Sequence, residues 1–189
     1  MSGDKYLIRD QHTIYFITLT VIKWIDIFTR ESYREIIVHS LNFCIKTKGL
    51  EVFAWVIMSN HVHLLVSCNA PHRMSDFLRD FKKFTSKEIV KVIDSSKESR
   101  RHWILKILSE EGNRLRRIKK FKLWKDDNHA IDLFRYHISI KQKMNYIHNN
   151  PVAAGIVDNA IDYVYSSCRD YCGRKGLVEV SPRFKVVDI

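Results

Sequence analysis

Two histidines lie one residue apart in an otherwise apolar run, NHVHLLV, which covers residues 60–66. If this run is a β-strand, side chains two residues apart point to the same face, so His61 and His63 project together while Val62 and Leu64 point the other way. Two neutral imidazoles side by side are good ligands for a divalent metal ion. Taken alone, the spacing also fits partly buried histidines that are hydrogen-bonded to the backbone.

A tyrosine and an asparagine form a second candidate pair in the stretch MNYIHNNPVAAGIV. Tyr146 and Asn150 are four residues apart, which places them on one face of a helix, close to the end that Pro151 predicts. A phenol beside an amide oxygen could serve a metal site from the other side. An interfacial tyrosine and a helix-terminal asparagine explain the same residues without any chemistry. His148 points roughly away from Tyr146, so we assign it no catalytic role.

The charge of the chain indicates a polyanionic partner. Its 32 Lys and Arg residues outnumber 21 Asp and Glu residues, for a formal net charge of +11. Clustered cations bind nucleic acid by neutralising phosphates and releasing counterions. The stretch RLRRIKKFKLWK, residues 114–125, is basic and contains no acid, and its aromatic rings could stack on unpaired bases. The candidate DNA contacts are Lys82, Lys83, Arg114, Arg116, Arg117, Lys119, Lys120, Lys122 and Trp124. A solvated helix face or a membrane-surface segment is the alternative.

Several classes of protein lack support in the sequence. There is no phosphate-binding loop of the GxxxxGK[ST] type, no GxSxG or HExxH motif and no EF-hand loop, so we expect no nucleotide cofactor. No stretch approaches the ~20 apolar residues of a membrane span, and the N-terminus, which contains acids and has no apolar core, does not resemble a signal peptide. Four cysteines without a regular spacing favour reduced thiols in the cytoplasm.

The elements that must position these residues follow from local patterns. Strands are expected over residues 13–22, 50–58 and 61–68, the last two as a hairpin around a Ser-Asn turn. Helices are expected from a Thr29 cap to Gly49, over 74–93, over 100–112 and over 139–149. A fourth strand is possible at 118–124, a short extended piece at 130–134, and the tail looks irregular. This order predicts an α+β sandwich, ferredoxin-like or related, with a central antiparallel sheet and flanking helices.

Three stretches together carry a resemblance to a known family. AWVIMSNHVHLLV, followed some eighty residues later by YIHNNPVAAGIV and then by DYVYSS, resembles the REP-associated tyrosine transposases, a branch of the single-tyrosine HUH transposases. The letters HUH stand for His, a hydrophobic residue and His, which residues 61–63 match. The Tyr-Ile-x-x-Asn-Pro-Val pattern is matched by residues 146–152. The resemblance predicts one HUH domain over residues 1–189, with a core at about 8–167 and a tail at about 168–189 that matches nothing in the family.

The resemblance implies a chemistry and a substrate. His61, His63 and Asn150 would hold one Mg²⁺ or Mn²⁺, although many single-tyrosine relatives carry glutamine at the third position. Tyr146 would attack a phosphate of single-stranded DNA near a hairpin-forming repeat and form a 5′-phosphotyrosine link. The expected protein is a DNA-nicking and strand-transfer enzyme, monomeric or homodimeric, in the bacterial cytoplasm and associated with the nucleoid. The alternative is a protein that binds DNA hairpins and has lost turnover.

Overall fold

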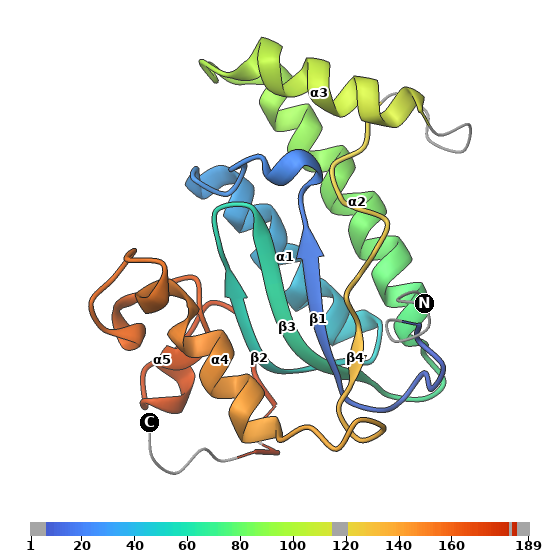
Figure 1. Ribbon diagram of the computed structural model, residues 1–189, viewed down its shortest axis with the longest axis vertical. Helices are drawn as coiled ribbons and strands as arrows, with labels where there is room; N and C mark the ends of the chain where they lie inside the picture. Colours follow the sequence, from blue (N-terminus) through green and yellow to red (C-terminus); the bar gives the residue numbers. More distant parts are fainter. Residues whose placement is uncertain (1–6, 115–120, 182, 185–189) are drawn as a thin grey trace.

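The computed structural model describes residues 7–114, 121–181 and 183–184, and within them the strands form one antiparallel sheet. The strands are β1 (Tyr15–Thr20), β2 (Leu50–Ile57), β3 (His61–Cys68) and the two-residue β4 (Ile131–Asp132). Their order is β2-β3-β1-β4, with every pair antiparallel (Figure 1). This is the ferredoxin-like order, so the predicted α+β class with a central antiparallel sheet and flanking helices is confirmed.

Helices cover both faces of the sheet. α1 (Glu31–Thr47) and α2 (Met74–Ser95) pack against each other and cover one face, while α4 (Ile140–Ala153) packs on β2 and β3 from the other (Figure 1). α3 (Arg101–Asn113) follows α2 and packs against it. The apolar run of β2 was expected to be central or covered on both sides; β2 is an edge strand, and α1 and α4 cover its two faces. No helix in the described ranges is both long enough and apolar enough to cross a membrane.

Two predicted helix boundaries were wrong. Thr29 does not cap α1: Arg30 occupies the cap position without a side-chain hydrogen bond, and the Thr29 hydroxyl instead donates to the carbonyl of Asp26. Pro151 does not end α4, which continues to Ala153. Proline removes a single helical hydrogen bond, and here that loss falls in the last turn, where the buried ring packs well. Asn150 therefore lies inside the helix rather than beyond a frayed end.

The possible strand at 118–124 lies partly outside the described residues, and the described part forms only an isolated bridge between Trp124 and Val21. The extended piece expected at 130–134 is confirmed as β4. The segment read as irregular contains short 3₁₀ and α turns, Ala160–Asp162 and α5 (Cys168–Tyr171).

The C-terminal segment runs along the outer edge of β2. Ile57 donates a backbone hydrogen bond to Tyr165, and Ser167 donates one to Trp55. Farther along, the Tyr171 hydroxyl donates to the carbonyl of Phe53 at 2.5 Å, and the Ser181 amide donates to Val52. The described tail is therefore part of the folded body, attached to the strand that precedes the histidine pair.

Candidate active site

The two histidines share one face of β3, as their spacing predicts. Their ring centroids lie 4.6 Å apart, with the ring planes at 72°. β3 lies between β2 and β1, so the pair is at the centre of the sheet, opposite Thr20 and Thr18 of β1. His63 is 4% exposed, whereas His61, at the first position of the strand, is partly open to solvent.

A hydrogen bond holds each imidazole at its Nδ1 atom. His61 Nδ1 lies 2.8 Å from Oδ1 of Asn60, and His63 Nδ1 lies 2.9 Å from Oγ1 of Thr18. The Asn60 amide nitrogen donates to Oδ1 of Asp26 at 2.9 Å, so its amide oxygen must be the atom that faces His61. An amide oxygen can only accept, and His61 therefore carries its proton on Nδ1. This leaves the Nε2 lone pair of His61 available to a ligand.

Burial keeps the two imidazoles neutral. It lowers the pKa of His61. The pKa of His63 is lowered to about 3 by burial, and also by the repulsion that a protonated His61 and Lys143 would exert on a second cation. His63 Nε2 is buried and has no hydrogen-bond partner within the described residues. A buried polar atom without a partner costs free energy, and a bound cation would remove that cost. A neutral imidazole pair with both Nδ1 atoms occupied fits a divalent metal ion.

The helix α4 brings Tyr146 beside the pair. Met144, Ile147 and Pro151 are buried, which leaves Tyr146 on the flank of the helix near β3. The Tyr146 ring centroid lies 5.3 Å from that of His63, and 49% of the residue is exposed. Lys143, one turn earlier, has its Nζ 5.5 Å from the same ring centroid. The structure thus joins the two motifs that the sequence keeps far apart.

Asn150 is not joined to the pair in the same way. Its amide nitrogen lies 3.4 Å from the backbone carbonyl of Tyr146, and among the described residues it forms no hydrogen bond with either histidine. The described part of the chain also contains no cluster of three His, Cys, Asp or Glu side chains that could hold a metal. The role of Asn150 as third ligand therefore stays a prediction.

His148 belongs to the core rather than to this site. It is buried, and its Nε2 lies 2.9 Å from Oγ of Ser167, which in turn bonds to the Trp55 backbone of β2. Burial lowers the pKa of His148 to about 4. The side chain ties the tyrosine helix to the C-terminal segment, and it takes no part in the histidine pair.

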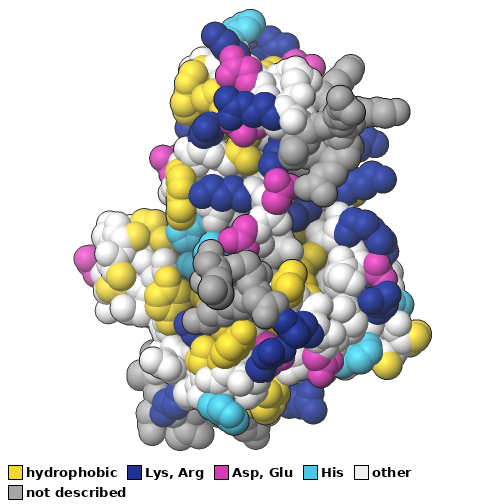
Figure 2. Space-filling view, turned by 45° about the vertical axis from the view of Figure 1, so that its right-hand side comes forward, with side chains coloured by type: hydrophobic (Ala, Val, Ile, Leu, Met, Phe, Trp, Pro, Cys, Tyr) yellow, Lys and Arg dark blue, Asp and Glu magenta, His cyan; other side chains and the backbone are white. Residues whose placement is uncertain are grey.

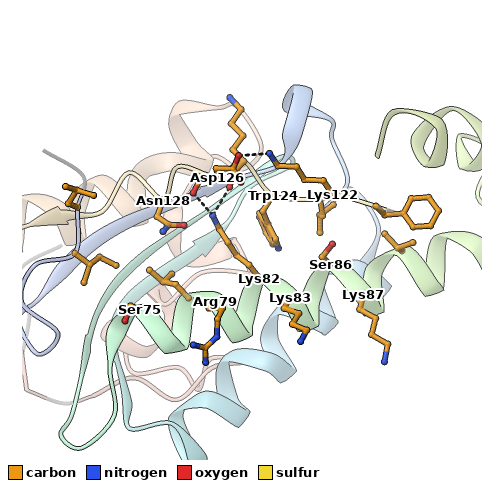
Figure 3. A pocket seen from close by; sticks show the side chains of 17 residues that line it. Ser75, Arg79, Lys82, Lys83, Ser86, Lys87, Lys122, Trp124, Asp126 and Asn128 are labelled. Atoms are coloured by element: carbon orange, nitrogen blue, oxygen red, sulfur yellow. Dashed lines mark hydrogen bonds and ion pairs between the residues drawn. The ribbon is translucent and has the colours of Figure 1, made fainter. Parts of the chain in front are cut away.

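On the face that Figure 2 shows, the described basic side chains are spread out rather than gathered in one patch. A groove of about 1080 Å³ lies between α2 and residues 121–128. Lys82 points across it and donates to the backbone carbonyl of Lys125 at 2.7 Å, whereas Lys83 and Lys87 extend away from residues 121–128 (Figure 3). Burial lowers the pKa of Lys82 to about 8, and its hydrogen bonds to the backbone carbonyls of Lys125 and Asp126 attach this segment to α2.

The other predicted DNA contacts have varied environments. Lys122 lies 2.8 Å from the Asp126 carboxylate, and the exposed Arg114 lies 2.7 Å from Glu111. Trp124 is a core residue: it is 4% exposed and donates from Nε1 to Oγ1 of Thr85. Its ring offers no open face to a base. The remaining candidates, Arg116, Arg117, Lys119 and Lys120, lie outside the described residues.

Sequence reasoning missed the residues that orient the histidines. Asn60 was read as a turn residue, although its position directly before His61 was a usable signal. Thr18 could not have been found, because its approach to His63 depends on the register of β1 against β3. Asp26 is likewise brought to Asn60 by the folding of the segment before α1.

Comparison with known proteins shows which family and which solved structures the chain is similar to. Residues 11–104 match the family model described as "Transposase IS200 like", and no curated protein matches the chain. A solved REP-associated tyrosine transposase bound to a REP hairpin is 17% identical, and the match covers 100% of both chains with a TM-score of 0.58. A protein of Deinococcus radiodurans R1 assigned as a transposase is 18% identical over 78% of this chain and 98% of its own, with a TM-score of 0.45. Residues 11–104 are thus similar to the IS200-like transposase family, and the chain has the fold of a REP-associated tyrosine transposase.

Proposed function

We propose that this protein is a metal-dependent endonuclease and strand transferase for single-stranded DNA, which cuts at or near hairpin-forming repeats. The observation that carries the proposal is the position of Tyr146 beside two neutral imidazoles whose Nε2 atoms are free to bind a metal ion. The similar structure that holds a REP hairpin supports DNA of this kind as the substrate. The net charge of +11 also favours a nucleic acid.

His61 and His63 would hold one Mg²⁺ or Mn²⁺ ion, with Asn150 as the proposed third ligand. When bound, such an ion offsets the negative charge that develops on a phosphate oxygen. Asn60 and Thr18 hold the two imidazoles at their Nδ1 atoms, and the Lys143 ammonium adds positive charge beside the phenol, which favours an anionic substrate.

The reaction we propose exchanges one phosphoester bond for another. The Tyr146 oxygen attacks the phosphorus and loses its proton to solvent, while the bond to the 3′-oxygen breaks and that oxygen takes up a proton. The products are a 5′-phosphotyrosine link and a free 3′-OH. Because the link conserves the ester bond, a 3′-OH can later attack it and join a new strand, which hydrolysis by water would prevent.

The test is a search for the covalent adduct. End-labelled hairpin DNA with single-stranded flanks is incubated with the protein and Mn²⁺ and then separated on a denaturing gel. We expect a protein-linked band that disappears in Tyr146→Phe and remains in the control variant Tyr136→Phe. His61→Ala and His63→Ala should abolish the band while largely sparing DNA affinity, since backbone charge supplies most of that affinity.

The same experiment decides between enzyme and binding protein. Hairpin binding without any adduct, across Mg²⁺, Mn²⁺ and several flanking sequences, would overturn the proposal and favour a hairpin-binding protein without turnover. If folded His61→Ala and His63→Ala lost DNA affinity along with the adduct, the expectation that these histidines serve cleavage rather than DNA binding would be wrong.

A further inference from the structure

Trp24 is an exposed aromatic residue next to the histidine pair. It ends the short 3₁₀ turn Ile22–Trp24, which connects β1 to α1, and it is 57% exposed. Its ring centroid lies 6.4 Å from that of His61, with the ring planes at 77°. Burying so large a ring in the core would stabilise the fold, as it does for Trp55 and Trp124. The fold does not bury Trp24.

The backbone at this position is strained. Lys23 and Trp24 have φ values of 52° and 55°, in the left-handed region that residues other than glycine seldom adopt. Surrounding contacts hold this conformation: Lys23 Nζ lies 3.3 Å from the Glu111 carboxylate on α3, and the Trp24 carbonyl lies 3.4 Å from the Asn60 amide nitrogen. Strain that the surroundings maintain is most common at functional sites.

Lys125 lies directly over the Trp24 ring. Its Nζ is 4.1 Å from the ring centroid, and its backbone amide donates to Thr20, the residue opposite His61 in the sheet. Lys125 also lines the groove between α2 and residues 121–128. A cation, an exposed indole ring and the His61 imidazole thus follow one another from the groove to the histidine pair.

We propose that Trp24 and Lys125 form a stacking platform, on which the Trp24 ring receives one unpaired base and the Lys125 ammonium binds the adjacent phosphate. The ligand class is single-stranded DNA, because a duplex keeps the faces of its internal bases stacked on one another. The position beside His61 would seat a nucleotide close to the phosphate that Tyr146 attacks. This inference rests on the proposed function for the identity of the ligand as DNA.

The first test is equilibrium binding of a short single-stranded oligonucleotide, without metal, in a Tyr146→Phe background that prevents turnover. Trp24→Ala should weaken binding by about 5- to 150-fold, the range that loss of one base–aromatic stack produces. Trp24→Phe should retain most of the affinity. The control is Trp103→Ala, which removes a tryptophan of similar exposure, 51%, from α3 outside the groove and should change affinity less than twofold. Affinity for a blunt duplex should be the same in the Tyr146→Phe parent and in the three tryptophan variants made in it.

Two further measurements separate stacking from an indirect effect on folding. In Trp103→Phe, Trp24 is the remaining exposed tryptophan, so saturating oligonucleotide should quench its fluorescence and shield it from acrylamide. Lys125→Gln should reduce the slope of log affinity against log salt by about 0.7, the value for one phosphate contact with a single strand.

The proposal would be overturned if folded Trp24→Ala had an affinity for the single strand within twofold of that of its parent. It would also be overturned if the oligonucleotide did not change the Trp24 fluorescence. An equal loss of affinity for the duplex would assign the effect to general charge rather than stacking and would also overturn it. The proposed function fails differently: it requires the covalent adduct at Tyr146, which the binding experiments do not measure. If the binding experiments show no stacking on Trp24 but the wild-type protein still forms the adduct at Tyr146, the stacking proposal is wrong and the proposed function is not contradicted.

Discussion

The hydrogen bond between Asn60 and His61 should control metal affinity, and Asn60→Ala removes it. The substitution also removes the Asn60 bond to Asp26, so nothing then selects the Nδ1-protonated form of His61 or holds its ring angle. Outer-shell partners of a ligand histidine are typically worth 10- to 100-fold in affinity, which corresponds to about 1.4–2.8 kcal/mol. His63 keeps its bond to Thr18, so we expect a result near the lower end of that range.

The assay is isothermal titration of metal-free protein with Mn²⁺ at neutral pH, and it needs no DNA and no turnover. Asn149→Ala, an exposed asparagine on α4 with no described side-chain hydrogen bond, is the matched control and should bind Mn²⁺ as the wild type does. The double variant Asn60→Asp, Asp26→Asn keeps an acceptor for His61, avoids two facing carboxylates and reverses the direction of the bond between positions 60 and 26, so it should recover much of the affinity. Urea unfolding should show a small loss of stability for Asn60→Ala, about 0.5–1.5 kcal/mol for each hydrogen bond removed.

One outcome would refute the reasoning. If folded Asn60→Ala bound Mn²⁺ within twofold of the wild type, the orientation of His61 would not depend on Asn60. If instead Asn60→Ala and the double variant Asn60→Asp, Asp26→Asn lost affinity equally, loss of the turn rather than loss of the acceptor would explain the effect.

Three further predictions concern single side chains. Asn150→Ala should weaken Mn²⁺ binding less than His61→Ala does, and an unchanged titration would remove it from the ligand set. Burial lowers the pKa of His148 from 6.5 to about 4, so on acidification the unfolded chain takes up a proton at this position before the folded protein does. The free energy of unfolding should therefore fall as the pH drops from 6.5 to about 4. In urea unfolding, the stability of His148→Gln should depend less on pH over this range. Thr85→Val leaves the Trp124 indole N–H buried without an acceptor and should cost about 1–3 kcal/mol in the same assay; a neutral result would mean that water reaches the indole.

Local patterns were enough to predict the sheet but not its register. The alternation around His61 and His63 defined a strand and a shared face, and the β2–β3 hairpin followed from the turn between them. The partners Thr18 and Asp26 come from segments that are distant in the sequence, so the alternating pattern of β3 could not predict them. The antiparallel pairing of β1 with β3 places Thr18 opposite His63.

The basic stretch illustrates why burial is hard to predict from composition. Trp124 stands between lysines, and its neighbours favoured an exposed ring available to DNA. The bridge to Val21 and the Thr85 acceptor on α2 draw the ring into the core instead. The exposed aromatic residue is Trp24, which lies in an ordinary apolar stretch and whose exposure depends on an unusual backbone conformation.

The C-terminal segment along β2 also limits how copies of this protein can associate. An edge strand with free N–H and C=O groups invites pairing with another chain, and proteins prevent this by covering the edge. Here Tyr165, Ser167, Tyr171 and Ser181 of the same chain bind backbone groups at four positions of β2, which are Val52, Phe53, Trp55 and Ile57. Two copies cannot extend one sheet across this edge while that segment is in place. Any dimer that forms with the segment docked must use a different surface, and removal of the segment should promote self-association.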